Sequence, residues 1–437
     1  MRPATSTGSL GDLVARRQAE GKLVVQPRMG FADPARMRAG LVATKYARAC
    51  TVGTITLDSY TRVGDHASVL AALRCGDDLN GYPIVGHSAA TTRSVVRGVL
   101  DHDFPVQVRH GSADPRAIVT AMLAAGLDAT EGGPVSYCLP YSRTPLARAI
   151  EHWRESCELL AAARAPGREP HLETFGGCMM GQLCPPALLV ALSLLEGLFF
   201  ARHGLRSISF SYAQQTNADQ DTEAVTALRR LAGELLPHVK SHIVIYSYMG
   251  VYPRTAPGAL RLLEESARLA VVTGSARLIV KTSAEAFRIP TLEENVFALE
   301  SAARAAAEQR GPRPGEGADT GIYAQAQALV GAVLELGGDL GRALRTAFAR
   351  GYLDVPYCLH PDNAGRTRAY LDPVGRLQWQ RIGSLPIRHA VELPGAARMT
   401  SAELMDSLSF VQNKFDHGAL AWSRPESSRV NREREPQ

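Results

Sequence analysis

The stretch from Leu23 to Leu57, LVVQPRMGFADPARMRAGLVATKYARACTVGTITL, contains two short β-rich runs separated by a helical pattern. The runs are LVVQP (Leu23–Pro27) and TVGTITL (Thr51–Leu57). The segment between them opens with Asp-Pro, which is typical of a helix N-terminus. Continuous apolar strands that alternate with helices are the pattern of parallel βαβ units. This stretch therefore predicts an α/β protein with a parallel sheet.

The same alternation continues along the chain as far as Thr282. Helical patterns separate seven further strand candidates: PIVGH (Pro83–His87), VQVRH (Val106–His110), ATEGGPVSY (Ala129–Tyr137), HLETF (His171–Phe175), SISFSY (Ser207–Tyr212), HIVIYS (His242–Ser247) and LIVKT (Leu278–Thr282). Eight strand–helix units close a TIM (β/α)8 barrel. The sequence predicts this fold and implies that one of the nine candidates is wrong or lies outside the barrel. An open doubly wound sheet is the alternative, disfavoured because no G-x-G-x-x-G follows the first strand.

The domain organisation follows from where this alternation stops. We expect an N-terminal extension at residues 1–21, a TIM-barrel catalytic domain at 22–311 and a C-terminal helical and loop-rich region at 312–422. PRPGEGADTG (Pro312–Gly321) has the composition of a linker, a helix is expected near Ala324–Arg350, and CLHPDNAGRTRAYLDP has a loop-like composition. The polar residues 423–437 predict a disordered tail.

Composition and charge disfavour several classes of protein. The 437 residues include 48 basic and 43 acidic side chains, and the net charge of +5 is spread along the chain, which disfavours nucleic-acid binding. The absence of an apolar run of about 18 residues disfavours a membrane span, and the N-terminus lacks the apolar core of a secretory signal. The seven cysteines form no C-x-x-C pair, so we expect a reducing, cytoplasmic location. The twelve histidines include no H-E-x-x-H, so no metal site is indicated.

Polar side chains occur at or just after the ends of the predicted strands. In a TIM barrel these positions face the active site. They include three arginines, Arg28, Arg62 and Arg109, which suit a substrate with two carboxylates because arginine binds a carboxylate bidentately. Glu131 could accept a hydrogen bond from an ammonium group or act as a base. Together these residues predict a pocket for an amino dicarboxylic acid, and the other members of the set are His110, Tyr137, Tyr141, Glu173, Phe175, Lys281 and Glu285.

Structural explanations exist for several of these residues. Arg62 could pair with Asp58 or Asp65, and Lys281 with Glu285 could form a local i,i+4 ion pair. Tyr137 and Tyr141 could be packing residues, and Phe175 alone fits a hydrophobic core.

A series of longer motifs narrows these alternatives. QPRMG, TLDSYTR, NGYP, VRHGSADP, EGGPVSYCLPY, HLETFG, YMGVYP and KTSAEAFRIPT occur in this order. From about Val24 to Tyr357 the chain resembles the catalytic E (epsilon) subunit family of methylaspartate mutase, also called glutamate mutase. This family is adenosylcobalamin-dependent, folds as a TIM barrel, and interconverts L-glutamate and (2S,3S)-3-methylaspartate by a radical route. The resemblance therefore implies an isomerase, an intramolecular transferase, that shares adenosylcobalamin with a separate cobalamin-binding S (sigma) subunit in an E2S2 assembly.

The resemblance also implies roles for individual residues. Substrate binding would fall to the three arginines, His110, Glu131, Tyr137 and Tyr141, with Glu131 at the ammonium group and as a catalytic base. Cofactor binding would fall to Gly30, Asn80, Pro140, Tyr252, Lys281, Glu285 and Ile289. Lys281 and Glu285 would hold the adenosyl ribose.

The sequence departs from the resemblance in ways that matter. The D-x-H-x-x-G signature of the cobalamin-binding subunit is absent, so the chain should be inactive alone. Residue 252 is Tyr where the family pattern has Phe, and the CLHPDNAGRTR segment diverges. Two alternatives stay open. One is a cobalamin-independent TIM-barrel lyase or aldolase acting on a dicarboxylate, and the other is a non-catalytic partner or scaffold.

Overall fold

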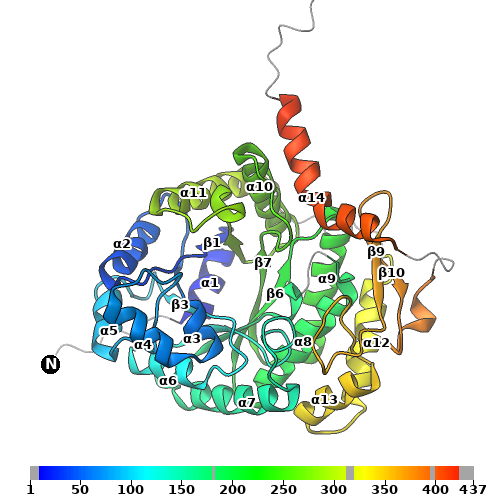
Figure 1. Cartoon of the computed structure of the whole chain (residues 1–437), viewed down its shortest axis with the longest axis horizontal. Coiled ribbons are helices and arrows are strands. Elements are labelled where there is room, and N and C mark those ends of the chain that lie inside the picture. The colour runs from blue at the N-terminus through cyan, green and yellow to red at the C-terminus, as the bar shows by residue number, and fades with distance from the viewer. Residues whose placement is uncertain (1–8, 180–182, 312–318, 394–398, 423–437) are drawn as a thin grey trace, which may run out of the picture.

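A computed structural model describes residues 9–179, 183–311, 319–393 and 399–422 of the chain, without the side chains of 418–422. Eight parallel strands form one sheet in the order β1-β8-β7-β6-β5-β4-β3-β2. The two ends of this sheet meet, because Val25 of β1 bridges Thr51 and its N–H donates to the carbonyl of Cys50 at 2.8 Å. The sheet is therefore a TIM barrel (Figure 1). Its strands are β1 (Val24–Pro27), β2 (Gly53–Thr56), β3 (Val106–Arg109), β4 (Ala129–Gly132), β5 (His171–Thr174), β6 (Ser207–Ala213), β7 (Lys240–Tyr246) and β8 (Arg277–Val280).

Strands form in eight of the nine predicted segments, although the one predicted at Ala129–Tyr137 ends at Gly132. The prediction of a strand at PIVGH (Pro83–His87) is wrong. Those residues form a turn in which the N–H groups of Gly86 and His87 donate to the carbonyl of Pro83 at 2.9 and 3.1 Å. Proline cannot donate a ladder hydrogen bond, and glycine favours a bend. Only Tyr82, just before the segment, bridges to Leu57 beside β2.

Helices surround the barrel in chain order (Figure 1). They are α2 (Pro34–Lys45), α3 (Ser59–Val63), α4 (His66–Cys75), α5 (Ala89–Val96), α6 (Arg116–Ala124), α7 (Leu146–Ala162), α8 (Pro186–Arg202), α9 (Ala218–Leu235), α10 (Ala256–Val272) and α11 (Leu292–Glu308). The 3-10 turns η1 (Gly176–Cys178) and η2 (Ser283–Ala286) lie after β5 and β8.

A short N-terminal helix, α1 (Leu10–Ala19), covers the end of the barrel opposite the carboxyl ends of the strands. Its buried Leu10, Leu13 and Val14 pack with Val24 and Val52, which lie at the starts of β1 and β2, and with Ala129 and Ala276. This end of the barrel is therefore closed by apolar packing, and the carboxyl ends of the strands form the open mouth.

The C-terminal region packs against α7, α8, α9 and α10 of the barrel. It contains α12 (Ile322–Leu334), α13 (Leu340–Arg350), a hairpin of β9 (Arg368–Leu371) and β10 (Leu377–Arg381), η3 (Arg388–Ala390) and α14 (Ser401–Trp422). The single helix expected near Ala324–Arg350 is divided, because Gly337 adopts φ +138° and Asp339 caps α13. The segment expected to be loop, CLHPDNAGRTRAYLDP, contains β9. The tail at 423–437 and most of the linker at Pro312–Gly321 lie outside the described residues.

The packing of α12 on α8 explains the composition of α8. PALLVALSLLEGLFFAR is apolar on every side, and all of its residues from Pro186 to Phe200 are buried. A helix that is apolar all round must be covered all round. Strands β5 and β6 cover its inner face, and α12 covers it from outside. The one charged residue within this buried span, Glu196, is 0% exposed.

Candidate active site

Arg109 and Glu131 form a buried ion pair at the carboxyl ends of β3 and β4. Nη2 of Arg109 lies 2.8 Å from Oε2 of Glu131, and both side chains are at most 5% exposed. The guanidinium group also lies over the ring of Tyr246, 4.9 Å from its centroid. The other terminal nitrogen of Arg109, Nη1, is buried and has no hydrogen-bond partner among the described residues. A buried cationic donor without a partner is costly, so this nitrogen is suited to an anion that enters the site.

His110 supplies a second donor next to Arg109. The backbone N–H of Ser112 donates to Nδ1 of His110 at 3.0 Å, which places the ring proton on Nε2. Nε2 is buried and has no partner within the described part of the chain. Burial, together with the nearby charge of Arg109, lowers the pKa of His110 to about 3. The imidazole is therefore a neutral donor at physiological pH.

Two tyrosine hydroxyl groups contact Glu131. Tyr137 donates to Oε1 at 2.5 Å, and Tyr246 donates to Oε2 at 2.7 Å. Burial raises the pKa of Glu131, Arg109 opposes that rise, and the charge of Glu173 adds to it. Glu131 is thus a carboxylate whose proton affinity is increased by its surroundings, as an acid or base in a dry site requires.

Tyr246 links Glu131 to a second buried carboxylate. Its hydroxyl also contacts Glu173, which forms an ion pair with the fully buried Arg277. Burial raises the pKa of Glu173, but the charges of Arg277 and Arg109 lower it by more than burial raises it. The net change in the pKa of Glu173 is therefore downward. Sequence reasoning found Glu173 but missed Tyr246. The available signal was its place next to the end of the predicted HIVIYS run (His242–Ser247), where a side chain can reach the mouth.

A second cluster, around Lys281 and Glu285, lies at the ends of β1 and β8. Nη1 of Arg28 lies 2.6 Å from Oε1 of Glu285, and Nζ of Lys281 lies 3.1 Å from the same oxygen. The Lys281 ammonium also lies 5.2 Å from the centre of the Tyr252 ring. Burial lowers the pKa of Lys281 to about 8, with Glu285 acting against that shift. The expected i,i+4 contact between Lys281 and Glu285 is present, and Arg28 joins it from a strand distant in sequence.

Arg62 has neither of the partners that the sequence suggested. Asp58 accepts from the backbone of Thr61 and caps α3, and Asp65 accepts from the backbone of Ser68 and caps α4. Arg62 is exposed and forms no ion pair with any described residue. The Arg62 cation is therefore available for binding an anion.

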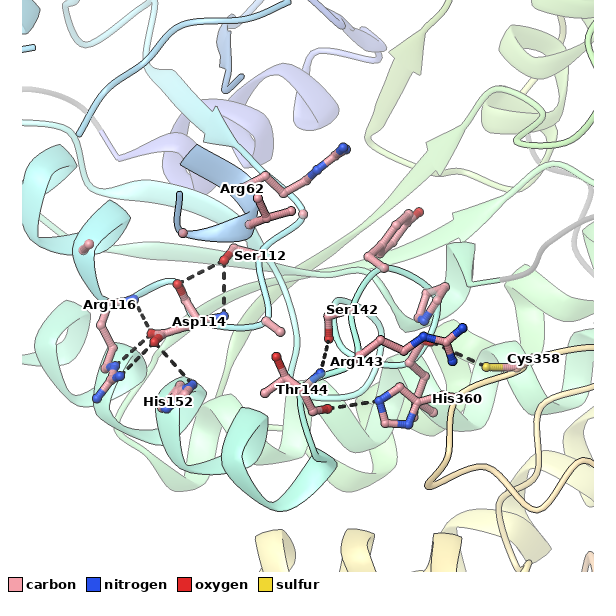
Figure 2. A pocket seen from close by; sticks show the side chains of 18 of the residues that line it. Arg62, Ser112, Asp114, Arg116, Ser142, Arg143, Thr144, His152, Cys358 and His360 are labelled. Carbon is pink, nitrogen blue, oxygen red and sulfur yellow. Dashed lines mark hydrogen bonds and ion pairs between the residues drawn. The ribbon is translucent and has the colours of Figure 1, made fainter. Parts of the chain in front are cut away.

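Arg62 lines a groove of about 1280 Å³ beside the mouth, together with Pro140 and Tyr141. In Figure 2, Arg62 lies apart from Asp114, Arg116 and Arg143, which line the same groove. Tyr141 is 44% exposed but recessed, so burial raises its pKa to about 12, while the charges of Arg28 and Arg62 oppose the rise. Arg28, Arg62 and Tyr141 thus share one electrostatic environment.

The remaining predicted cofactor residues lie in the loops that follow strands of the barrel, and they are Gly30, Asn80, Pro140, Tyr252 and Ile289. The side-chain oxygen of Asn80 accepts from the backbone N–H of Ser59 at 2.9 Å. Ile289 is 51% exposed, and Tyr252 is buried with a hydroxyl group that has no partner among the described residues. At Gly30, any side chain would overlap the carbonyl oxygen of Thr56, so the close approach of the loop after β1 to the end of β2 requires glycine.

The described residues form neither a metal-binding cluster nor a helix that could span a membrane. No group of three or more His, Cys, Asp or Glu residues there is arranged to hold a metal ion. Within the same residues, no helix is long and apolar enough to cross a bilayer.

The fold and the site define a TIM-barrel protein whose mouth combines arginines with a buried carboxylate. The family model described as Methylaspartate mutase E chain matches residues 6–403. The chain belongs to this family.

Curated relatives agree with this assignment. The glutamate mutase epsilon subunit of Halobacterium salinarum is 34% identical over 76% of this chain and 71% of its own length. The subunit of the same name from Haloarcula marismortui is 33% identical over 79% and 72%, and that of Escherichia coli O157:H7 is 29% identical over 84% and 79%. Among solved structures, a truncated 3-deoxy-D-arabino-heptulosonate 7-phosphate synthase from Thermotoga maritima aligns with a TM-score of 0.35 at 11% identity over 66% of this chain and 84% of that one. Through its family the chain is a mutase, and so an isomerase.

Proposed function

We propose that this chain is the catalytic subunit of a glutamate mutase. It interconverts L-glutamate and (2S,3S)-3-methylaspartate in the cytoplasm, using adenosylcobalamin and a separate cobalamin-binding S subunit in an E2S2 assembly. The observation that carries the proposal is the pair of partnerless buried donors, Nη1 of Arg109 and Nε2 of His110, beside the carboxylate of Glu131. Donors of this kind suit a carboxylate, and Glu131 suits an ammonium group.

The substrate's two carboxylates would bind at different places. One binds the donors of Arg109 and His110 at the end of β3. The other binds Arg62, which has no carboxylate partner in the described part of the chain, with Arg28 nearby. Tyr137, Tyr141 and Phe175 form an aromatic wall, with the ring centroids of Tyr137 and Phe175 4.9 Å apart and those of Tyr137 and Tyr141 5.9 Å apart. This wall excludes water from the substrate and keeps it close to Glu131.

Glu131 would bind the substrate's ammonium group and exchange a proton with it. Its carboxylate accepts hydrogen bonds from two tyrosines and pairs with Arg109, so its position is fixed before the substrate binds. Because its surroundings raise its pKa, Glu131 can accept a proton from the ammonium group and return it to the amine.

The residues around Lys281 fit the adenosyl part of the proposed cofactor. Lys281, Glu285 and the partnerless hydroxyl of Tyr252 offer two donors and an acceptor to the hydroxyl groups of a ribose. The exposed Ile289 and the adjacent Phe287, which is 66% exposed, offer apolar surface at the same rim. When bound, adenosylcobalamin would supply the carbon-radical chemistry that a carbon-skeleton rearrangement needs. The chain lacks the D-x-H-x-x-G signature, so the cobalamin must be brought by the partner.

Reconstitution tests the proposal. The purified chain is mixed with an S subunit, adenosylcobalamin and L-glutamate, and 3-methylaspartate is measured by chromatography. We expect product only when all components are present, and a loss of at least roughly a hundredfold for Arg109→Ala, which leaves Glu131 buried without its cation. Absence of product, together with no cob(II)alamin signal on adding glutamate, would contradict the proposal.

The alternative of a cobalamin-independent lyase or aldolase has its own test. Turnover of a dicarboxylic acid by the chain alone, lost in the same Arg109→Ala variant, would favour that class. Arg109 lies in the anion site under both hypotheses, so loss of activity in Arg109→Ala does not distinguish them. Measuring whether activity requires adenosylcobalamin does.

A further inference from the structure

Glu196 is a fully buried carboxylate that the proposed chemistry does not use. It lies on α8, outside the ring of strands, and is the one acidic residue of an apolar helix. Burial raises its pKa to about 7, while hydrogen bonds from backbone N–H groups pull it down. An apolar side chain would fill this position without the cost of burying a carboxylate, so the contacts of Glu196 must offset that cost.

Four backbone N–H groups from two loops of the described chain donate to the Glu196 carboxylate. Oε1 accepts from Val135 at 3.3 Å and from Ser136 at 2.9 Å, in the loop after β4. Oε2 accepts from Phe175 at 3.1 Å and from Gly176 at 2.8 Å, in the loop after β5. Each carboxylate oxygen thus holds one loop, and the Glu196 side chain joins the two loops.

Those loops carry the aromatic wall of the site. Tyr137, which donates to Glu131, follows directly after Val135 and Ser136, and Phe175 is itself one of the donors to Glu196. The ring of Phe175 also lies 5.5 Å from that of Tyr246, centroid to centroid. A displacement of either loop would therefore move the groups that surround Glu131.

The glycine in the EGG motif is explained by the same contact. A side chain at Gly133 would overlap the carboxylate of Glu196. The motif therefore lets the loop after β4 approach α8 closely enough for its N–H groups to reach Glu196. This close approach is a structural reason for glycine at position 133.

We propose that Glu196 is a positioning residue for the active site, which acts from α8 by holding the loops after β4 and β5. Tyr137 is thereby kept in contact with Glu131, and Phe175 is kept packed against Tyr137 and Tyr246. The catalytic part of this inference rests on the proposed function. The part that concerns the loops does not, because it can be measured on the chain without substrate.

The claim that Glu196 holds the two loops is tested by hydrogen exchange. Exchange rates of single amides are measured by mass spectrometry in the full-length wild type and in Glu196→Gln. Glutamine replaces one accepting oxygen with a donor group that faces two N–H groups. We expect the amides of Val135, Ser136, Phe175 and Gly176 to exchange at least roughly tenfold faster as a set, while amides of β6 and β7 keep their rates. Wild-type rates at all four amides would overturn the inference, as would an equal increase throughout the chain.

Asp221→Asn is the matched control. Asp221 is also a fully buried acid on a barrel helix, but it accepts from the backbone of Gln215 and the hydroxyl of Tyr212. Its substitution should loosen Gln215 and leave the four loop amides unchanged. If Glu196→Gln does not fold, Glu196→Asp takes its place. The shorter acid cannot reach both loops, so at least one loop should loosen, and two unchanged loops would overturn the inference.

The effect of Glu196 on catalysis is tested with the reconstituted enzyme. We expect Glu196→Gln to lower kcat/KM for L-glutamate by at least roughly tenfold while the concentration of S subunit needed for half-maximal activity stays the same. Loosened loops with unchanged kcat/KM would overturn the positioning role. Loosened loops in a chain whose wild type has no mutase activity would contradict the proposed function instead.

Discussion

The hydroxyl group of Tyr246 lies 2.7 Å from Oε2 of Glu131 and also contacts Glu173, so one hydroxyl joins two buried carboxylates. A hydroxyl has one proton to donate. The second contact is therefore favourable only when one of the carboxyl groups carries a proton. Burial and the charge of Glu173 raise the pKa of Glu131, whereas arginines lower that of Glu173, so Glu131 is the one of the two that takes up a proton more readily.

Tyr246→Phe removes a hydrogen bond that favours the ionised form of Glu131. The pKa of Glu131 should rise further, and the acidic limb of the pH profile of kcat/KM should move up by about one pH unit. Tyr248→Phe is the control, because the buried hydroxyl of Tyr248 has no partner among the described residues. An acidic limb at the same pH in wild type and Tyr246→Phe would contradict this link.

Arg62→Lys should raise KM for L-glutamate, since a point charge replaces a bidentate fork. We expect an increase of roughly tenfold with a smaller effect on kcat, measured by steady-state kinetics of the reconstituted enzyme. Arg143→Lys is the matched control, because Arg143 is an exposed arginine in the same groove whose guanidinium donates to the carbonyl of Leu359. Equal KM values for wild type and Arg62→Lys would make Arg62 a structural residue.

Lys281 should make the stability of the chain depend on pH. Its pKa is about 8 in the folded chain and 10.5 ordinarily, so the unfolded chain holds this proton across a range where the folded chain has lost it. Stability from this group therefore increases as pH rises between those values, by up to about 3 kcal/mol.

The measurement compares wild type with Lys281→Met by urea unfolding at several pH values. The difference in unfolding free energy should shift in favour of wild type as pH rises from about 8 to about 10. Titratable groups that both proteins share contribute equally to the pH dependence of each, so their contribution cancels in this difference. A difference that is constant with pH would mean that Lys281 keeps an ordinary pKa despite Glu285 and Arg28 beside it.

Gly30→Ala should destabilise the chain, because the added methyl group would overlap the backbone carbonyl of Thr56. Backbone cannot rotate away as a side chain can, so we expect a loss of about 2 kcal/mol or more in unfolding free energy. Gly233→Ala is the control: it lies in α9, and its added methyl group meets no other atom within 4 Å. There the substitution should leave stability unchanged or raise it by up to about 1 kcal/mol. Equal stabilities for the two variants would contradict the close contact at Gly30.

The sequence by itself determined the barrel and the residues at its mouth. Short apolar runs separated by helical patterns predict parallel βα units wherever the chain is buried on both faces, and the carboxyl ends of such strands must share one edge. Arg109, His110 and Glu131 were predictable for this reason. The ordered motifs then identified the family, because long motifs carry more information than any single spacing.

Only the tertiary structure decided which of these groups touch. Arg28 pairs with Glu285 across 257 residues, Tyr246 reaches Glu131 across 115, and Glu196 binds the two loops from a helix whose pattern indicates nothing but burial. Periodicity reports the face on which a side chain lies, which is a local property of the backbone. Pairing between strand ends depends on the register and closure of the barrel, and these are set only when all eight strands have assembled.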